Sequence, residues 1–144
     1  MEHTFHMLIY RAFHAQRSAL RPCLSELGMG AGQPKLLSYL NRYGPSSQRQ
    51  LADYFEIDPA AVCRMLDSLQ KGGFITRRAD GRDKRRDLVE LTEAGRQACE
   101  TWGARCWEIE ARMLRGFTPA ERQRFADYLA RAYRNLRTEE GERP

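Results

Sequence analysis

Long apolar runs are missing from this 144-residue sequence. No stretch approaches the roughly 18 apolar residues that indicate a membrane span, and the N-terminus lacks the basic and apolar segments of a secretory signal. The four cysteines form no CxxC pair, and in a chain without an export signal they are expected to be reduced thiols. These absences predict a cytoplasmic protein with no membrane partner.

Catalytic and metal-binding motifs are also missing. The sequence contains no G-x-S-x-G, no phosphate-binding glycine loop and no H-E-x-x-H. His3 and His6 are one helical turn apart, but no neighbouring Cys, Asp or Glu cluster completes a tetrahedral set. We therefore expect no enzyme activity, no metal site and no cofactor.

Basic residues are present in a slight excess that is concentrated in one place. The net charge is +5, and the ten residues 77–86 contain six basic and two acidic side chains. The rest of the chain therefore carries only +1. A local basic cluster suits an anion such as a nucleic-acid backbone, although a charge run of this kind is also typical of a solvated loop.

Apolar residues make up 42% of the chain, enough for one domain of residues 1–144 to form a core without disulfides. Apolar side chains at three- and four-residue spacing predict a first helix over 5–27, with Pro22 expected to kink or end it. A second helix is predicted from Pro34 to Gly44, with Leu36, Leu37, Leu40 and Tyr43 as its apolar stripe.

The middle of the chain carries clear start signals. Residues 47–50 match a capping box for a short third helix, and Asp58 followed by Pro59 predicts the start of a fourth. Two β-prone runs, 74–77 and 88–91, predict a hairpin with the basic stretch at its tip. A fifth helix is expected from Thr92 to Gly116, and a second capping box at 118–121 opens a sixth.

This order of elements predicts a mainly α (α+β) fold. A short helix, a tight turn, a second helix and a β-hairpin together form a winged helix-turn-helix. In such a fold the second helix enters the major groove of DNA, which is wide enough to admit it.

Several ordered motifs resemble the MarR family of bacterial transcriptional regulators. The most specific run extends from residue 58 to residue 95 and includes DPAAVCRMLDSL, GFITR, DKRR and LTEAG. The resemblance implies a homodimer with dimerisation helices at 4–30 and 93–137 and a winged helix-turn-helix at 33–92. It also implies binding to a pseudo-palindromic double-stranded DNA operator, commonly as a repressor. Many such proteins release DNA on binding phenolic or other lipophilic effectors, and some respond to cysteine oxidation.

Large apolar side chains at both ends of the chain favour the same assembly. Phe5, Phe13, Trp102, Trp107 and Tyr128 are more than a small winged-helix core needs, and a dimer interface would bury the surplus.

Candidate DNA contacts lie in three places. In the wing, Arg85 matches the family's minor-groove arginine, and Asp83 matches an acidic residue that could orient a wing arginine. On the fourth helix Arg64 matches the recognition-helix arginine, whereas Cys63 departs from the Thr or Ser usual there. The free N–H groups that open the third helix could hold a phosphate. The full candidate set is Ser47, Gln48, Pro59, Ala60, Ala61, Cys63, Arg64, Arg82, Asp83, Lys84, Arg85 and Arg86.

An effector pocket and a redox site are the less specific expectations. The candidate pocket residues are Tyr10, His14, Arg17, Pro34 and Leu37, although an aromatic stripe is more often part of a core. The alternative to a ligand-responsive regulator is one that senses oxidants through a cysteine, for which Cys23 is the first candidate. A reactive thiol needs exposure and a lowered pKa.

Overall fold

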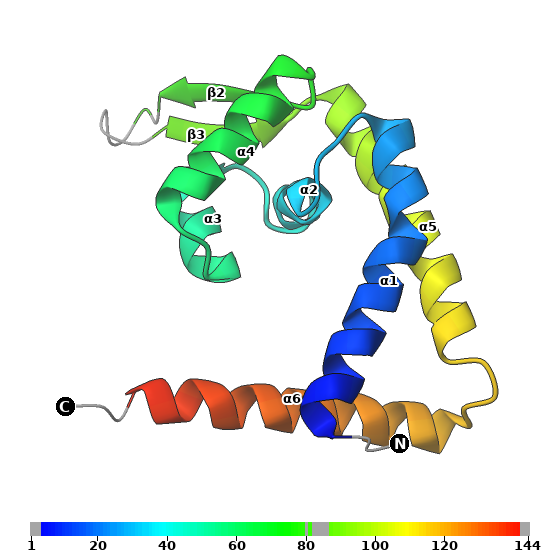
Figure 1. The fold of residues 1–144 in the computed structure, drawn as a ribbon. Coiled ribbons are helices and arrows are strands. Elements are labelled where there is room, and N and C mark those ends of the chain that lie inside the picture. The colour runs from blue at the N-terminus through cyan, green and yellow to red at the C-terminus, as the bar shows by residue number, and fades with distance from the viewer. Residues whose placement is uncertain (1–3, 80, 82–86, 142–144) are drawn as a thin grey trace. The chain divides into compact units, whose positions relative to one another are not determined.

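The computed structural model describes residues 4–79, 81 and 87–141, and the chain divides into two compact units at Ile109. The first unit contains α1 (Phe5–Leu27), α2 (Gln33–Tyr43), β1 (Ser46–Ser47), α3 (Gln48–Phe55), α4 (Pro59–Lys71), β2 (Ile75–Ala79), β3 (Asp87–Leu91) and most of α5 (Glu93–Met113). The second contains the end of α5 and α6 (Pro119–Gly141). Figure 1 shows α4 packed beside the β2–β3 hairpin, with α2 and α3 next to it. The mainly helical winged fold is therefore confirmed.

Local hydrogen bonds explain where the helices begin. The Ser47 hydroxyl accepts from the Gln50 N–H at 3.1 Å while the Gln50 side chain accepts from the Ser47 N–H at 2.8 Å, so the predicted capping box is present. A carboxylate oxygen of Asp58 accepts from the Ala61 N–H at the start of α4. The same reciprocal pattern joins Thr118 and Glu121 before α6, and the N–H donated by Thr118 lowers the pKa of the Glu121 carboxyl.

Two features of the helices differ from the expectation. Pro22 lies inside α1 and does not end it, because the helix continues to Leu27 and stops where Gly28 takes φ 69°. Tyr43, expected on the inward stripe of α2, is instead 54% exposed, and its ring packs against the rings of Tyr39 and Tyr54.

The sheet has three antiparallel strands in the order β1-β3-β2. The hairpin register pairs Ile75 with Leu91 and Ala79 with Asp87, so both strands extend closer to the wing tip than the predicted runs. The short strand β1 pairs Ser46 with Val89 and was not predicted. It ties the segment before α3 to the wing.

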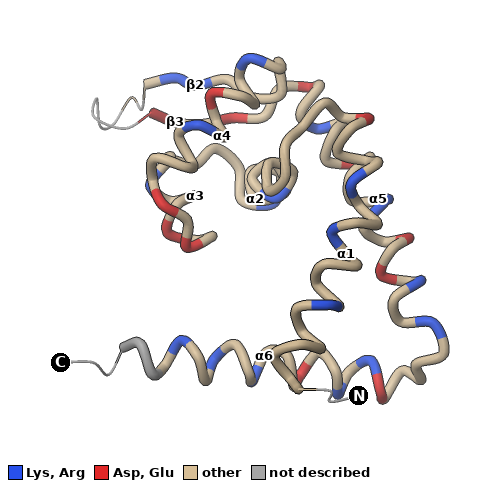
Figure 2. The backbone as a smooth tube through the Cα atoms, viewed as in Figure 1, with Lys and Arg blue, Asp and Glu red and all other residues tan. Residues whose placement is uncertain are grey.

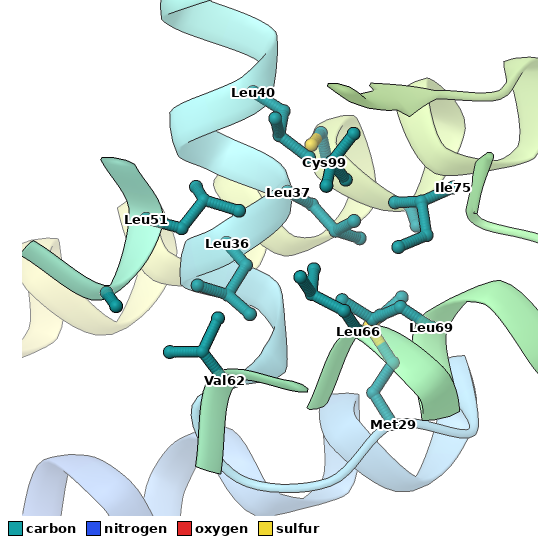
Figure 3. Close-up of a cluster of buried hydrophobic side chains, with 13 residues drawn as sticks. Met29, Leu36, Leu37, Leu40, Leu51, Val62, Leu66, Leu69, Ile75 and Cys99 are labelled. Carbon is teal, nitrogen blue, oxygen red and sulfur yellow. The ribbon is translucent and has the colours of Figure 1, made fainter. Parts of the chain in front are cut away.

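One apolar core holds the first unit together. Figure 3 shows buried side chains from α2, α3, α4, β2 and α5 converging on one another. Leu36, Leu51, Val62, Leu66 and Leu69 have essentially no exposed surface. Each such side chain contributes about 1.5–3 kcal/mol on burial. This core fixes α3 and α4 in place and leaves their outer faces free to contact another molecule.

The helices outside this core expose large apolar side chains. On α1, Phe5 is 85% exposed and Phe13 is 55% exposed. In the second unit, Phe117 packs on Phe125, and the apolar side of α6 is exposed, with Leu136 at 70%. Within the described residues, no helix is long and apolar enough to span a membrane.

Candidate nucleic-acid interface

The helix-turn-helix consists of α3, a sharp turn and α4. The turn is made by Glu56, whose φ of 55° is in the left-handed region and whose N–H donates back to the carbonyl oxygens of Ala52 and Asp53. Across the turn the Gln48 side chain donates to the Pro59 carbonyl at 3.5 Å. The first residue of α3 is thereby linked to the first residue of α4, the two helix ends on which candidate DNA contacts were predicted.

The outer face of α4 carries the predicted recognition residues. Val62, Leu66 and Leu69 face the core with no exposed surface. The exposed candidates on the helix are Pro59, Ala60 and Arg64, whereas Ala61 and Cys63 are half-buried. The helix therefore presents one side that a groove could accept, and the DNA contacts of these residues stay a prediction.

Ser47 is less accessible than a phosphate contact would require of its side chain. It is buried, and its hydroxyl is already used in the capping box. Its main-chain N–H is also bonded to Gln50. The contribution predicted for Ser47 is consistent with helix capping, and the phosphate contact stays a prediction.

Arg77 makes a contact between the wing and α4 that was not predicted from the sequence. Its Nη1 lies 2.8 Å from Asp67 Oδ1 on α4, and its Nη2 donates to the Cys63 carbonyl at 3.4 Å. The Arg77 side chain is 19% exposed, and its buried Nε has no hydrogen-bond partner among the described residues. It therefore joins the first wing strand to the recognition helix, instead of reaching out to an anion.

Strand alternation is the signal that could have identified this role. Along β2, Ile75 is buried, Thr76 is exposed and Arg77 is half-buried, so Ile75 and Arg77 lie on the same face of the strand. Arg78 lies on the other face and pairs with Glu90 across the hairpin. Figure 2 shows the basic segment of β2 in blue, and acidic segments towards the end of α3 in red.

The five predicted wing contacts, Arg82, Asp83, Lys84, Arg85 and Arg86, lie outside the described residues. The two strands that lead to them are described and are paired along their full length. The contacts themselves stay predictions.

The effector candidates fall into two groups. On α1, the rings of Tyr10 and His14 stack with their centroids 6.0 Å apart, and both residues are exposed. Arg17, also exposed, lies over the Phe13 ring. Pro34 and Leu37 on α2 are buried. The structure thus pairs Tyr10 with His14 and places Leu37 in the core, and a pocket shared by all five residues stays a prediction.

The cysteines differ in their environments. Cys23 and Cys99 are buried, whereas Cys63 and Cys106 are half-buried, and no disulfide joins any two of the four. Burial, with a smaller contribution from the negative charge of Glu100, raises the pKa of the Cys99 thiol. A higher pKa leaves less thiolate at neutral pH. Among the described residues no group of three or more His, Cys, Asp or Glu side chains could hold a metal ion.

Thiol labelling of the native protein should follow this order of burial. At neutral pH we expect iodoacetamide to label Cys63 and Cys106 first, and to label Cys23 and Cys99 about tenfold or more slowly than in the urea-unfolded chain. Peptide mass spectrometry after timed quenching gives the rate at each site. Rapid labelling of Cys23 in the folded protein would contradict this expectation and favour the redox alternative.

Comparison with known proteins agrees with this architecture. The profile of the MarR family matches residues 27–86. The HTH-type transcriptional regulator YdgJ of Bacillus subtilis is 33% identical over 109 residues, which are 76% of this chain and 66% of YdgJ. The crystal structure of a probable transcriptional regulator from Pseudomonas aeruginosa superposes with a TM-score of 0.80 at 29% identity, covering 90% of this chain and 96% of that one.

A second similar structure was solved with operator DNA. A mutant MarR from E. coli complexed with operator DNA has a TM-score of 0.80 at 26% identity, covering 88% of this chain and 91% of that one. The match to YdgJ spans about two thirds of that relative. The ordered motifs, the winged helix-turn-helix and these similarities agree with one another. The chain therefore belongs to the MarR family of transcriptional regulators.

Proposed function

We propose that this protein is a homodimeric, sequence-specific DNA-binding repressor of the cytoplasm, without enzyme activity, that binds a pseudo-palindromic operator. The observation that carries the proposal is the α3–turn–α4 unit, whose second helix has an apolar side in the core and an outer side bearing Arg64. An α-helix fits the major groove, where arginine can bond to guanine.

The hairpin supplies a second set of contacts. Its strands β2 and β3 lead to a tip with the sequence RDKRR over residues 82–86. A narrow minor groove concentrates negative potential and attracts a guanidinium, which suits Arg85. Arg82, Lys84 and Arg86 would then bind phosphates, and Asp83 would orient Arg85. The ion pair between Arg77 and Asp67 joins the wing to α4, which supports the proposal that both elements contact the same DNA.

Dimerisation would bury the apolar faces of α1 and α6. These faces are exposed in the single chain, as Phe5 and Leu136 illustrate. In a symmetric dimer two copies of α4 could bind half-sites about 34 Å apart, one turn of the duplex. A phenolic or lipophilic ligand that altered this separation would release the DNA, because both copies must fit one duplex at once.

Replacing Arg85 tests the wing contact. We expect Arg85→Ala to lower affinity for DNA from the promoter region of the protein's own gene about tenfold or more, since a minor-groove guanidinium is lost. Fluorescence anisotropy titrations at several salt concentrations measure the affinity and the salt dependence, which should be smaller in the variant. Arg124→Ala on α6 removes the same charge from an exposed site outside the winged helix. Equal affinities for the Arg85 and Arg124 variants would contradict the proposal.

A further inference from the structure

Thr92 connects the start of α5 to the turn that joins α4 and β2. Its hydroxyl donates to the Gly73 carbonyl at 2.6 Å and accepts from the Gly95 N–H at 3.0 Å. Its own N–H donates to the Phe74 carbonyl at 3.0 Å. An N-cap hydroxyl needs to bond only to a backbone N–H of its own helix. The Thr92 hydroxyl also forms a hydrogen bond with Gly73, which is 19 residues away in the sequence.

Gly95 brings the two backbones into direct contact. It is buried, and a Cβ placed on it would lie 2.1 Å from the Phe74 carbonyl oxygen. Because this neighbour is backbone, it cannot move aside as the end of a flexible side chain could. Glycine is needed at this position for the close approach and not for an unusual φ, because its φ is not among the positive values of the chain.

The same turn is the end of the recognition helix. The N–H groups of Gly72 and Phe74 donate to the carbonyls of Ser68 and Leu69 in the last turns of α4. Thr92 therefore contacts a segment that is itself bonded to α4. Further along β2, Arg77 joins this strand to α4 through Asp67. The helix α4, the strand β2 and the start of α5 are consequently linked to one another by hydrogen bonds.

We propose that Thr92 and Gly95 are positioning residues that set the angle between α5 and the DNA-binding elements, and through it the operator spacing that the dimer accepts. This inference rests on the proposed function, because it requires two DNA-binding units in one dimer. A small rotation at the junction is magnified at the far end of α4. Two copies of α4 bind one duplex face only when their separation matches one helical turn, about 34 Å, so a change of angle weakens the full operator while each half-site is bound as before.

The experiment compares full operators with half-sites. Thr92→Val keeps the shape of the side chain and removes the hydroxyl, Thr92→Ser restores it, and Gly95→Ala introduces the obstructed Cβ. Gly103→Ala is the matched control, because a Cβ at that position of α5 has nothing within 4 Å. Binding is measured by anisotropy on a full operator, on operators whose centre-to-centre spacing is changed around 10 base pairs, and on one isolated half-site. Dimer mass is measured for each variant.

We expect Thr92→Val and Gly95→Ala to bind the full operator about tenfold more weakly and to prefer a different spacing. Their half-site affinity and dimer mass should stay within about twofold of the wild type, and Thr92→Ser and Gly103→Ala should match the wild type throughout. Equal losses on the half-site and the full operator, or an unchanged spacing preference for Thr92→Val, would overturn the inference. Failure of the wild type to bind any operator would instead overturn the proposed function. If Gly95→Ala does not fold, the two Thr92 variants decide the outcome.

Discussion

Asp67→Ala is expected to lower the free energy of unfolding by about 2 kcal/mol, the range of a lost hydrogen bond to a charged group. The substitution leaves the Arg77 guanidinium in place with its side chain 19% exposed and its Nε already without a partner among the described residues. Alanine is a better helix former than aspartate, so its helix propensity offsets part of the lost stability. Urea unfolding of the variant and the wild type, followed by circular dichroism, measures the difference.

Glu90→Ala is the matched control for this substitution. It also removes the carboxylate partner of an arginine in β2, but the arginine that remains, Arg78, is 63% exposed and can be solvated. An exposed ion pair contributes about 0–1 kcal/mol. Equal destabilisation by the two substitutions would show that burial of Arg77 is not the cause.

Operator affinity is a second measurement for Asp67→Ala, because the loss of negative charge and the loss of the Arg77 contact are expected to change it in opposite directions. Removing the Asp67 carboxylate makes α4 more positive, which by charge alone strengthens binding to DNA. If Arg77 fixes the angle between wing and helix, affinity should fall in spite of this gain. A rise in affinity would indicate that Asp67 acts only through its charge.

Features that depend on local hydrogen bonds were predictable from the sequence. The capping boxes at Ser47 and Thr118 and the caps at Asp58 and Thr92 each need residues only three positions apart, and all are present. The order of helices and hairpin follows from those boundaries together with the period of the apolar residues.

Features that depend on distant segments were not predictable. The strand β1 has two residues, and it exists because Ser46 and Ser47 meet Val89 and Leu88. Tyr43 was expected inside because periodicity identifies a face of a helix but not the ring of Tyr54 on a neighbouring helix. The role of Arg77 was hidden in a basic stretch, where six similar charges suggested one common use. Only the packing of β2 against α4 separates it from the arginines of the wing.

The apolar faces of α1 and α6 were predicted from the sequence, but a single chain does not bury them. Leu136 is 70% exposed, and Phe5 is 85% exposed. Large exposed apolar patches of this kind on a protein surface mark an interaction site. In the proposed dimer they are buried by the second copy, so their contribution to stability depends on protein concentration.

Leu136→Glu should therefore dissociate the dimer while leaving each chain folded. At 70% exposure the single chain loses little when leucine is replaced, whereas a dimer would have to bury an unpaired carboxylate. The spacing of Phe125, Leu129 and Leu136 places them on one side of α6. Loss of the second DNA-binding unit removes the gain from bivalent binding, about a hundredfold or more in affinity. Analytical ultracentrifugation and operator titration measure the two effects.

Ala130→Glu provides the control on the same helix. It adds the same charge at an exposed position of α6 that is turned away from Phe125 and Leu136 by the helical period. We expect this variant to remain dimeric and to bind the operator with the affinity of the wild type, apart from the small effect of one added negative charge. If Leu136→Glu stays dimeric at micromolar concentration, the interface lies elsewhere, and the apolar side of α6 must have a different partner.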